Sequence, residues 1–374
     1  MLRHFLKTIV KFFYQFIFHS SDCVIFSDVM VQKQYCFKNS AGEDIYLFTL
    51  RNAKGTEVII TNYGAIITSF KIKNSDGSIN DIVLGFDKVE DYWSEDYLRQ
   101  YPWFGCAVGR CANRIKDSSF EIDDKKYLLS KNRGTDHLHG GIIGFDKKIW
   151  QFAASSNDPV SCLELKYMSP DGEEGYPGNL ETLIRFELND ENELSYQYTA
   201  TTDQPTVVNL THHSYFNLNN GKETISDHEI KIYSSQMLEQ DDNLTASGNI
   251  LPVENTPYDF RHFKSIGEGL KQVDEYDKSF VCGNKDLSLM AEARSLRSGI
   301  HLQVYSTDPV VHFYSGKWIP AVRGKNTVMY GPFSGFCLET HKHPNAINIP
   351  HFPNTVLRPG ENYYQKTVYK VNQV

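Results

Sequence analysis

Short segments in which apolar and polar residues alternate limit the folds open to this chain more than any other feature. Residues 183–188 (LIRFEL) and 194–200 (LSYQYTA) alternate with a period of two, and the segment between them, NDEN, consists of turn-forming residues. Two such runs around a short turn predict a β-hairpin. The same period recurs in three further segments, residues 229–233, 301–306 and 310–314.

Helical patterns are scarce, and the best candidate, residues 266–273, is short. Residues 57–73 consist of two β-rich stretches around a turn at 62–64. Neither a repeat of fixed period nor a low-complexity linker divides the chain after residue 30. Many short strands joined by turns rich in Gly, Asn and Asp predict an all-β fold with few short helices, a large antiparallel sandwich that residues 31–374 form as a single domain.

Composition excludes some functions and favours a location. Of the 374 residues, 40% are hydrophobic and 22% charged, which is typical of soluble globular proteins. The net charge of −8 argues against a nucleic-acid partner, because phosphates would not be neutralised. The seven cysteines include no C-x-x-C pair. We interpret Cys106 and Cys111 as buried thiols in a reducing compartment, which favours the cytoplasm.

Residues 1–30 differ from the rest of the chain. Apolar residues recur there at helical spacing, with Arg3, Lys7 and Lys11 nearby, as in a signal peptide, a helix lying on a membrane surface, or an extension without function. Lys11 and Gln15 interrupt the apolar run, so we do not expect it to span a membrane. Any membrane contact would involve this segment alone, and we expect a monomer.

Secretion or membrane association remains the alternative to a cytoplasmic location. Two N-glycosylation sequons begin at Asn209 and Asn243. A glycan on Asn209 would lie beside a candidate catalytic histidine and obstruct it, so secretion is the less favoured reading.

Two distant segments, NLTHHSYFN at 209–217 and GFCLET at 335–340, each place a group that can move a proton among apolar residues. In the first this group is a histidine, in the second Glu339. A histidine that can donate a proton and a carboxylate that can accept one are the minimum needed to open a hemiacetal ring. A buried carboxylate is rare unless it is paired or functional, so Glu339 is hard to explain as a structural residue.

Further polar residues have structural explanations as well as functional ones. Asn113 and Arg114 suit a turn and a surface ion pair, His139 could cap a glycine-rich loop, and Asp277 could be a solvated loop residue. On a strand, His212 and His213 would face opposite sides. Together, amide, guanidinium, imidazole and carboxylate groups are what a pocket needs to bind a polyhydroxylated ring.

A metal site is the main chemical alternative. His137 with His139, and His341 with His343, are two H-x-H pairs that could ligate zinc or iron together with Glu339. No third ligand stands at a diagnostic spacing, and the chain lacks H-E-x-x-H. We therefore expect no metal. The chain also lacks a P-loop, a Rossmann glycine motif and a G-x-S-x-G elbow.

Ten segments in order across residues 35–370 resemble the aldose 1-epimerases, also called galactose mutarotases. They are NYGA at 62–65, DIVLGFD at 81–87, VGRCANRI at 108–115, LHGG at 138–141, DGEEGYPG at 171–178, NLTHHSYFNL at 209–218, PYDFR at 257–261, DKSF at 277–280, GFCLET at 335–340 and LRPGENY at 357–363.

The resemblance implies a β-supersandwich with an open cleft on a concave sheet, and no cofactor. It implies that protonated His213 is the general acid, that Glu339 is the general base, and that the substrate is bound by Asn113, Arg114, His139 and Asp277. We add His312 to these binding residues, although the family often has glutamine there. Lys278 and His341 also depart from the family, which usually has histidine and glutamine at these positions, and each change could alter the charge near the cleft.

The expected function is interconversion of the α- and β-anomers of free aldoses such as galactose and glucose. One alternative is a non-catalytic sugar-binding or sensor protein on the same scaffold. Another is a phosphosugar epimerase, which would need cations around the cleft. Four residues keep that alternative open: Arg110, Arg114, Lys278 and Lys317.

Overall fold

The computed structural model describes residues 30–74, 76–283 and 286–373. The N-terminal segment for which a signal-like or membrane-surface role is considered lies outside these residues, apart from Met30. In the described part of the chain, no helix is both long and apolar enough to cross a membrane.

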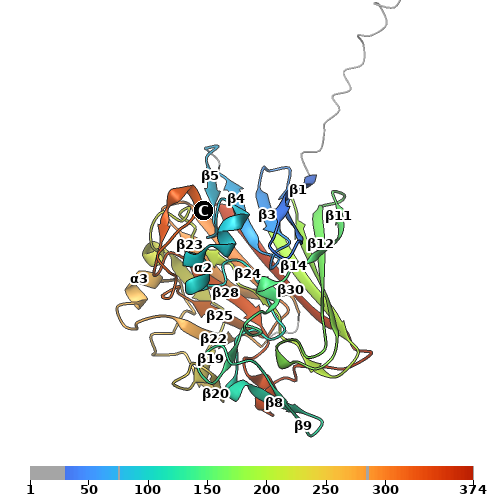
Figure 1. Ribbon diagram of the computed structural model, residues 1–374. Helices are drawn as coiled ribbons and strands as arrows, with labels where there is room; N and C mark the ends of the chain where they lie inside the picture. Colours follow the sequence, from blue (N-terminus) through green and yellow to red (C-terminus); the bar gives the residue numbers. More distant parts are fainter. Residues whose placement is uncertain (1–29, 75, 284–285, 374) are drawn as a thin grey trace, which may run out of the picture.

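Three antiparallel sheets dominate the fold (Figure 1). The largest has nine strands, in the order β11 (Gln151–Ser156), β12 (Ser161–Ser169), β13 (Leu180–Leu188), β14 (Glu193–Thr202), β30 (Tyr363–Gln373), β24 (Ile300–Ser306), β23 (Ser288–Ser295), β18 (Glu229–Ile232) and β21 (Lys264–Ser265). A five-stranded sheet follows chain order: β1 (Met30–Lys38), β2 (Asp44–Arg51), β3 (Glu57–Thr61), β4 (Ile67–Lys73) and β5 (Ile79–Asp81). A six-stranded sheet has the order β17 (Tyr215–Phe216), β28 (Phe336–His341), β25 (Val310–Tyr314), β22 (Asp277–Val281), β19 (Gln236–Gln240) and β20 (Ala246–Pro252).

The remaining elements are short. Five strand pairs are β6 (Ala107–Val108) with β16 (Thr211–His212), β7 (Arg114–Ile115) with β10 (His137–Leu138), β8 (Ser119–Ile122) with β9 (Lys125–Leu128), β15 (Thr206–Val207) with β29 (Val356–Leu357), and β26 (Val322–Arg323) with β27 (Met329–Tyr330). The α-helices within the described residues are α2 (Glu95–Arg99) and α3 (Ile266–Gly269). Single 3₁₀ turns occur at Val89–Trp93, Lys116–Ser118, Phe145–Lys147, Glu173–Gly175, Ile225–Asp227, Lys325–Thr327 and Ala346–Asn348.

The predicted all-β sandwich is confirmed, because one hydrophobic core joins all three sheets. Phe48 of the five-stranded sheet, Phe186 of the nine-stranded sheet and Phe313 of the six-stranded sheet belong to the same buried cluster. A bridge between Val83 and Phe216 links the edges of the two smaller sheets. The nine-stranded sheet therefore forms one layer of the sandwich, and the other two sheets form the opposite layer.

The predicted hairpin is confirmed as β13 and β14, which pair from Leu188 opposite Leu194. The predicted helix at residues 266–273 is too long, because α3 ends at Gly269. Two of its four residues are glycines, which lose the most backbone entropy in a helix, so it stops after one turn.

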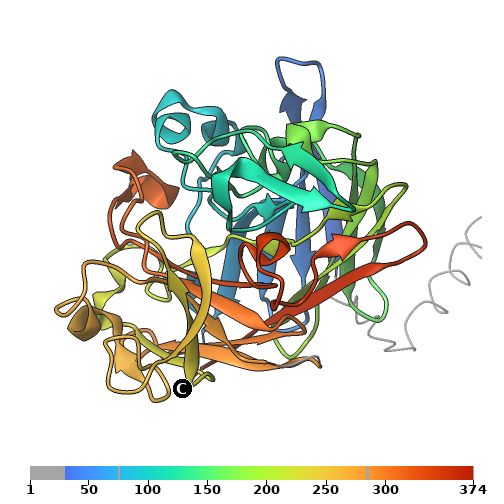
Figure 2. The same cartoon turned by 90° about the horizontal axis from the view of Figure 1, so that it is seen from below.

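Figure 2 views the molecule from the end at which β8, β9, β19 and β20 lie in Figure 1. The teal segment that includes β8 and the yellow strands of the six-stranded sheet lie beside each other there. An ion pair between Lys116 and Asp241 (3.0 Å) and a hydrogen bond from Thr245 to Asp136 (2.6 Å) connect them. The loops around β7 and β10 are thereby fastened over the outer face of the six-stranded sheet.

Candidate active site

Alternation along the strands separates the core from a cleft on the outer face of the six-stranded sheet. Phe336 and Leu338 of β28 lie in the core, whereas Glu339 lines the cleft. On β25, Phe313 lies in the core and His312 lines the cleft. Side chains of successive strand residues point to opposite faces, so a period of two assigns each residue to core or cleft.

The antiparallel register arranges the residues of the cleft face in two rows across the sheet. The first row is Ser279, His312 and Glu339, and the second is Asp277, Tyr314, Cys337 and Tyr215. Because Tyr215 pairs with Cys337, one further step of two residues along the antiparallel strands brings position 213 opposite position 339.

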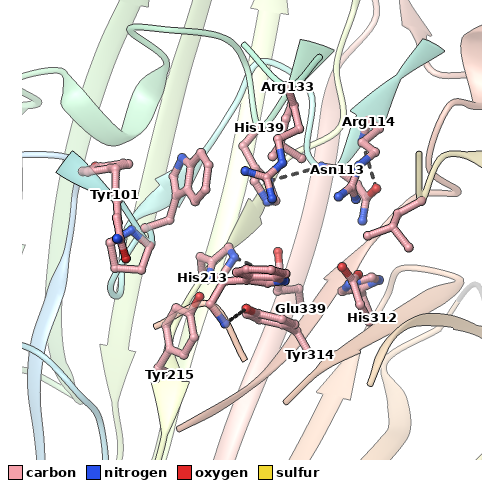
Figure 3. A pocket seen from close by; sticks show the side chains of 17 residues that line it. Tyr101, Asn113, Arg114, Arg133, His139, His213, Tyr215, His312, Tyr314 and Glu339 are labelled. Carbon is pink, nitrogen blue, oxygen red and sulfur yellow. Dashed lines mark hydrogen bonds and ion pairs between the residues drawn. The ribbon is translucent and has the colours of Figure 1, made fainter. Parts of the chain in front are cut away.

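The cleft contains about 670 Å³ of space and opens to solvent. Its lining residues come from eight separate parts of the chain: Gln100, Tyr101, Pro102, Trp103, Asn113, Arg114, Arg133, Leu138, His139, His213, Tyr215, Leu244, Asp277, His312, Tyr314, Trp318 and Glu339. Figure 3 shows Asn113, Arg114 and His139 on one side, facing Glu339 and His312 on the other. All seven residues predicted for the site therefore meet in a single cavity.

His213 and Glu339 are in direct contact. Nε2 of His213 lies 3.5 Å from Oε1 of Glu339, and both side chains are almost fully buried. Oε2 of Glu339 is buried and makes no hydrogen bond within the described chain. Both a proton acceptor and a ring nitrogen are thus directed to one point in the cleft.

Burial perturbs both groups of this pair. Burial raises the pKa of Glu339 to about 7, opposed by the positive charge of His312, and burial lowers the pKa of His213 to about 3. Low polarity disfavours the charged form of each group. The role of protonated His213 as general acid stays a prediction, and burial of the ring works against its charged form in the protein alone. Burial favours a proton on Glu339 over one on His213, and Glu339 loses that proton as the pH rises through about 7.

Asn113 and His139 fix each other's backbone. Both adopt left-handed conformations, with φ of 59° and 51°. The His139 amide donates to the carbonyl of Asn113 (3.0 Å), and the Asn113 amide donates to Nδ1 of His139 (3.3 Å). Burial lowers the pKa of His139 well below its usual value, so the ring is neutral. With Nδ1 as an acceptor, Nε2 carries the proton and can donate to a ligand.

Gly140 allows this arrangement, and its replacement should be highly destabilising. A Cβ on Gly140 would lie 1.8 Å from the carbonyl oxygen of Gly109, and its φ is +83°. Gly172 has nearly the same φ, +82°, but open space around it. We expect Gly172→Ala to lower the free energy of unfolding by about 1–2 kcal/mol, the cost of a left-handed alanine. Gly140→Ala should lower it by clearly more in denaturant titrations, and equal losses would contradict the clash.

The other predicted binding residues are charged or paired. Arg114 is buried, and its Nε has no hydrogen-bond partner within the described residues. Nε2 of His312 lies 2.8 Å from Oδ1 of Asp277, and Nδ1 of His312 contacts Oγ of Ser279 at 2.8 Å. Burial alone would raise the pKa of Asp277, but the hydrogen bond and charge of His312 lower it to about 2. Asp277 is therefore a permanent anion in the cleft.

The H-x-H pairs considered for a metal do not converge. His137 contacts the Tyr176 hydroxyl (2.8 Å) and the Ser130 carbonyl (2.7 Å), and His341 contacts the carbonyl of Lys342 (2.7 Å). Neither His137 nor His341 lines the cleft.

A different trio, His139, His213 and Glu339, places its potential ligand atoms within 4.8 Å of one another. Metal-bound histidines usually donate their second ring N–H to an acceptor. Nδ1 of His139 instead faces the backbone N–H of Asn113, so the donor set favours a hydrogen-bonding site over a metal site.

Two residues that differ from those expected by resemblance, Lys278 and His341, do not line the cleft. Lys278 donates to Gln240 (2.6 Å) and lies over the ring of Tyr258, 5.5 Å from its centre. His341 is buried beside His312, with ring centres 6.0 Å apart. Lys278 does not line the cleft, since alternation along β22 directs Asp277, and not its neighbour, into it. Its charge still reaches the cleft, because it is one of the charges that lower the pKa of Asp277.

The aromatic lining and the thiol beside His213 were not predicted from the sequence. The Trp103 ring is nearly parallel to the His213 ring (6.3 Å between centres, 25°), and the Tyr215 ring lies 5.0 Å from it. Sγ of Cys337 lies 3.5 Å from Nδ1 of His213. Tyr215 and Cys337 are each two residues from a predicted catalytic residue, so the strand period could have indicated both.

An all-β sandwich with a histidine–glutamate pair at the base of a polar, aromatic cleft provides the groups that a sugar-ring isomerase needs. The aldose 1-epimerase family matches residues 46–370 of this chain. The chain belongs to this family.

Individual members of the family are similar to this chain over most of its length. The chain is 41% identical to the galactose mutarotase of Sus scrofa over 315 residues, 83% of this chain and 89% of that one. It is 34% identical to the aldose 1-epimerase of Escherichia coli K12 over 339 residues, 88% of this chain and 96% of that one. The crystal structure of an aldose epimerase homologue from C. elegans superposes with a TM-score of 0.80 at 28% identity, covering 92% of this chain and all of that one.

Proposed function

We propose that this aldose 1-epimerase interconverts the α- and β-anomers of free aldoses such as galactose and glucose, with His213 as general acid and Glu339 as general base. The observation that carries the proposal is the 3.5 Å contact between the two side chains at the base of the cleft. One bound pyranose can meet both groups there, because its ring oxygen and its anomeric hydroxyl are bonded to the same carbon.

The single proton of the pair accounts for the chemistry. In the reacting complex, Glu339 as a carboxylate removes the proton from the C1 hydroxyl, and His213 as an imidazolium donates a proton to O5. The C1–O5 bond breaks, the open aldehyde forms, and the pair is left neutral. Rotation about C1–C2 exposes the other carbonyl face, and the reverse transfers close the ring as the opposite anomer. No cofactor is consumed.

The remaining polar residues bind the hydroxyl groups. His139 donates through Nε2, Arg114 offers a guanidinium whose Nε has no partner in the described part of the chain, and Asp277 and His312 form an acceptor–donor pair. Asn113 completes this wall of the cleft. Directed hydrogen bonds of this kind orient a ring that has little apolar surface.

Polarimetry on freshly dissolved α-galactose tests the function. We expect the protein to accelerate the change in optical rotation in proportion to its concentration. Saturable binding without acceleration would instead establish the sensor alternative. Glucose, xylose and arabinose in the same assay would rank the substrates.

The phosphosugar alternative loses support from three of its four cations. Arg110 is bound by Ser169, Pro170 and Pro177 away from the cleft. Lys278 bonds to Gln240, and Lys317 lies 3.7 Å from Glu275. We therefore expect a hexose 6-phosphate to compete weakly with galactose in the polarimetric assay.

The pH dependence should follow the proton of the pair. Burial lowers the pKa of His213 to about 3 and raises the pKa of Glu339 to about 7. Between these two pH values the pair holds one proton. Above about 7 it holds none, and below about 3 it has no base. We expect kcat/KM to fall as pH rises through about 7, with apparent pKa values that belong to the pair. Rates corrected for spontaneous mutarotation would show this limb, and a flat profile through neutral pH would contradict it.

We also propose a cytoplasmic monomer. The six cysteines within the described residues are all free, which supports a reducing compartment. Asn209 is buried, and its side chain bonds to the backbone of Lys342, so this sequon cannot carry a glycan in the folded protein.

A further inference from the structure

The loop that carries His139 follows a backbone path that histidine rarely adopts. His139, Gly140 and Gly141 have three successive positive φ angles, 51°, 83° and 110°. Glycine reaches this left-handed region readily, but a histidine there persists only where the surrounding structure holds it. The hydrogen bonds to Asn113 hold the turn at His139 itself, and residues 141–143 are held by a different part of the chain.

Glu174 supplies this second contact from the DGEEGYPG segment, to which the proposed mechanism gives no role. Its Oε1 accepts from the amide of Ile143 (2.9 Å), and its Oε2 accepts from the amide of Ile142 (3.0 Å) and from the hydroxyl of Ser130. Two successive backbone N–H groups around one anion form an anion-binding nest. Burial alone would raise the pKa of Glu174, but the hydrogen bonds from Ser130 and the two amides lower it, so the group remains a carboxylate at neutral pH.

Gly141 shows how closely the carboxylate approaches the loop. A Cβ on Gly141 would lie 2.2 Å from Oε2 of Glu174, so this position has no room for a side chain. Asn132 holds the same loop, because its amide nitrogen donates to the carbonyls of Leu138 and Gly141 (2.8 Å each). His139 lies between these fixed points, and its ring lines the cleft (Figure 3).

We propose that Glu174 is a positioning residue of the sugar site, whose carboxylate holds residues 141–143 so that Nε2 of His139 is presented to a sugar hydroxyl. Glu174 does not line the cleft, so it acts through the loop. The inference rests on the proposed function, in which His139 binds the sugar. It gives the DGEEGYPG segment a part in ligand binding, although none of the segment's residues lines the cleft.

Glu174→Gln tests this role with little change in the shape of the side chain. An amide offers one acceptor oxygen in place of two, and its NH₂ group faces a backbone N–H, so part of the loop is released. We expect KM for galactose to rise about 2–10-fold, which corresponds to the loss of one hydrogen bond to the sugar. We expect kcat to stay nearly unchanged, because the bond from His139 is lost equally from the bound sugar and from the transition state. Polarimetry measures both constants.

Two further variants separate positioning from stability. Glu173→Gln removes the neighbouring carboxylate of the same 3₁₀ turn, which contacts Tyr167 (2.7 Å) and Lys148 (2.6 Å) instead of the loop. Its KM and kcat should match those of the wild type. Ser130→Ala removes one donor from Glu174 and leaves both amide contacts, so KM should rise less than in Glu174→Gln. Because Ser130→Ala disturbs little else, it tests the role even where Glu174→Gln does not fold.

Coupling to His139 gives a readout that a purely structural role would not move. His139→Ala should raise KM, and adding Glu174→Gln to it should raise KM no further, because both changes remove the same bond to the sugar. Hydrogen exchange at the amides of Ile142 and Ile143 should be faster in Glu174→Gln than in the wild type. Independent effects on KM in the double variant, or unchanged exchange at both amides, would overturn the inference.

Calorimetry with galactose separates this inference from the proposed function. A wild type that binds galactose without accelerating mutarotation would overturn the proposed function alone. Galactose affinity about 2–10-fold weaker in Glu174→Gln would still support the positioning role. Unchanged affinity and unchanged KM in Glu174→Gln would overturn the positioning role and leave the proposed function intact.

Discussion

Glu339→Gln should lower kcat for galactose by about 10²–10⁴-fold, or about 2.7–5.5 kcal/mol of transition-state stabilisation, because the amide cannot take the proton of the anomeric hydroxyl. The substitution preserves the shape of the side chain and its place beside His213. The amide can still hydrogen-bond to a sugar hydroxyl, so we expect sugar binding to be largely retained. Initial rates by polarimetry and galactose binding by calorimetry measure the two quantities separately.

The control for this variant is Glu292→Gln. Glu292 is also a nearly buried glutamate, but it lies on β23 of the nine-stranded sheet and bonds to Tyr233. Its replacement tests what the loss of a buried carboxylate does to the fold without touching the cleft. We expect normal kcat there. Full activity in Glu339→Gln would refute the assignment of the base, and loss of both binding and fold would indicate a structural role.

His213→Asn should be comparably severe, with kcat reduced by about 10²–10⁴-fold. Asparagine can hydrogen-bond in the same place, but it cannot gain and lose a proton near neutral pH. The pH limb assigned to the pair should disappear together with the activity. Residual turnover above one per cent of wild type would argue that another group supplies the proton, and the His139 ring, with its centre 5.1 Å from that of His213, is a candidate.

The neighbouring histidine provides a matched control. His212 points away from the cleft, and its ring contacts the carbonyl of Ala65 (3.2 Å) and the hydroxyl of Ser214 (3.1 Å). We expect His212→Asn to lower the free energy of unfolding by about 1–3 kcal/mol, the cost of leaving a buried polar group unpaired. Its kcat per folded molecule should stay near wild type. Similar kinetic losses in both variants would mean that the segment acts only through its fold.

Local sequence patterns predicted where the strands lie better than they predicted the tertiary environment of each strand. The hairpin of β13 and β14 and the strand β24 were predictable because one face of each is more deeply buried than the other, which imposes a period of two. The strand β25 was predicted from the same period, although both of its faces are buried. The helix at 266–273 was overestimated, because a short apolar pattern does not reveal that glycines end the helix after one turn. The outer face of β28 was harder to predict, since Cys337 and Glu339 are as buried as Leu338, the core residue between them.

Three predictions followed from the sequence by itself: the all-β class, the family, and His213 with Glu339 as the candidate acid–base pair. These depend on residue type, spacing and order, which are properties of the sequence itself. The tertiary structure alone decided which atoms of that pair meet and what surrounds them. Pairing of β17 with β28 sets His213 against Glu339, and pairing of β22 with β25 sets Asp277 against His312. Burial then shifts the proton from His213 toward Glu339, because the cost of a charge depends on the three-dimensional environment and not on the neighbours in sequence.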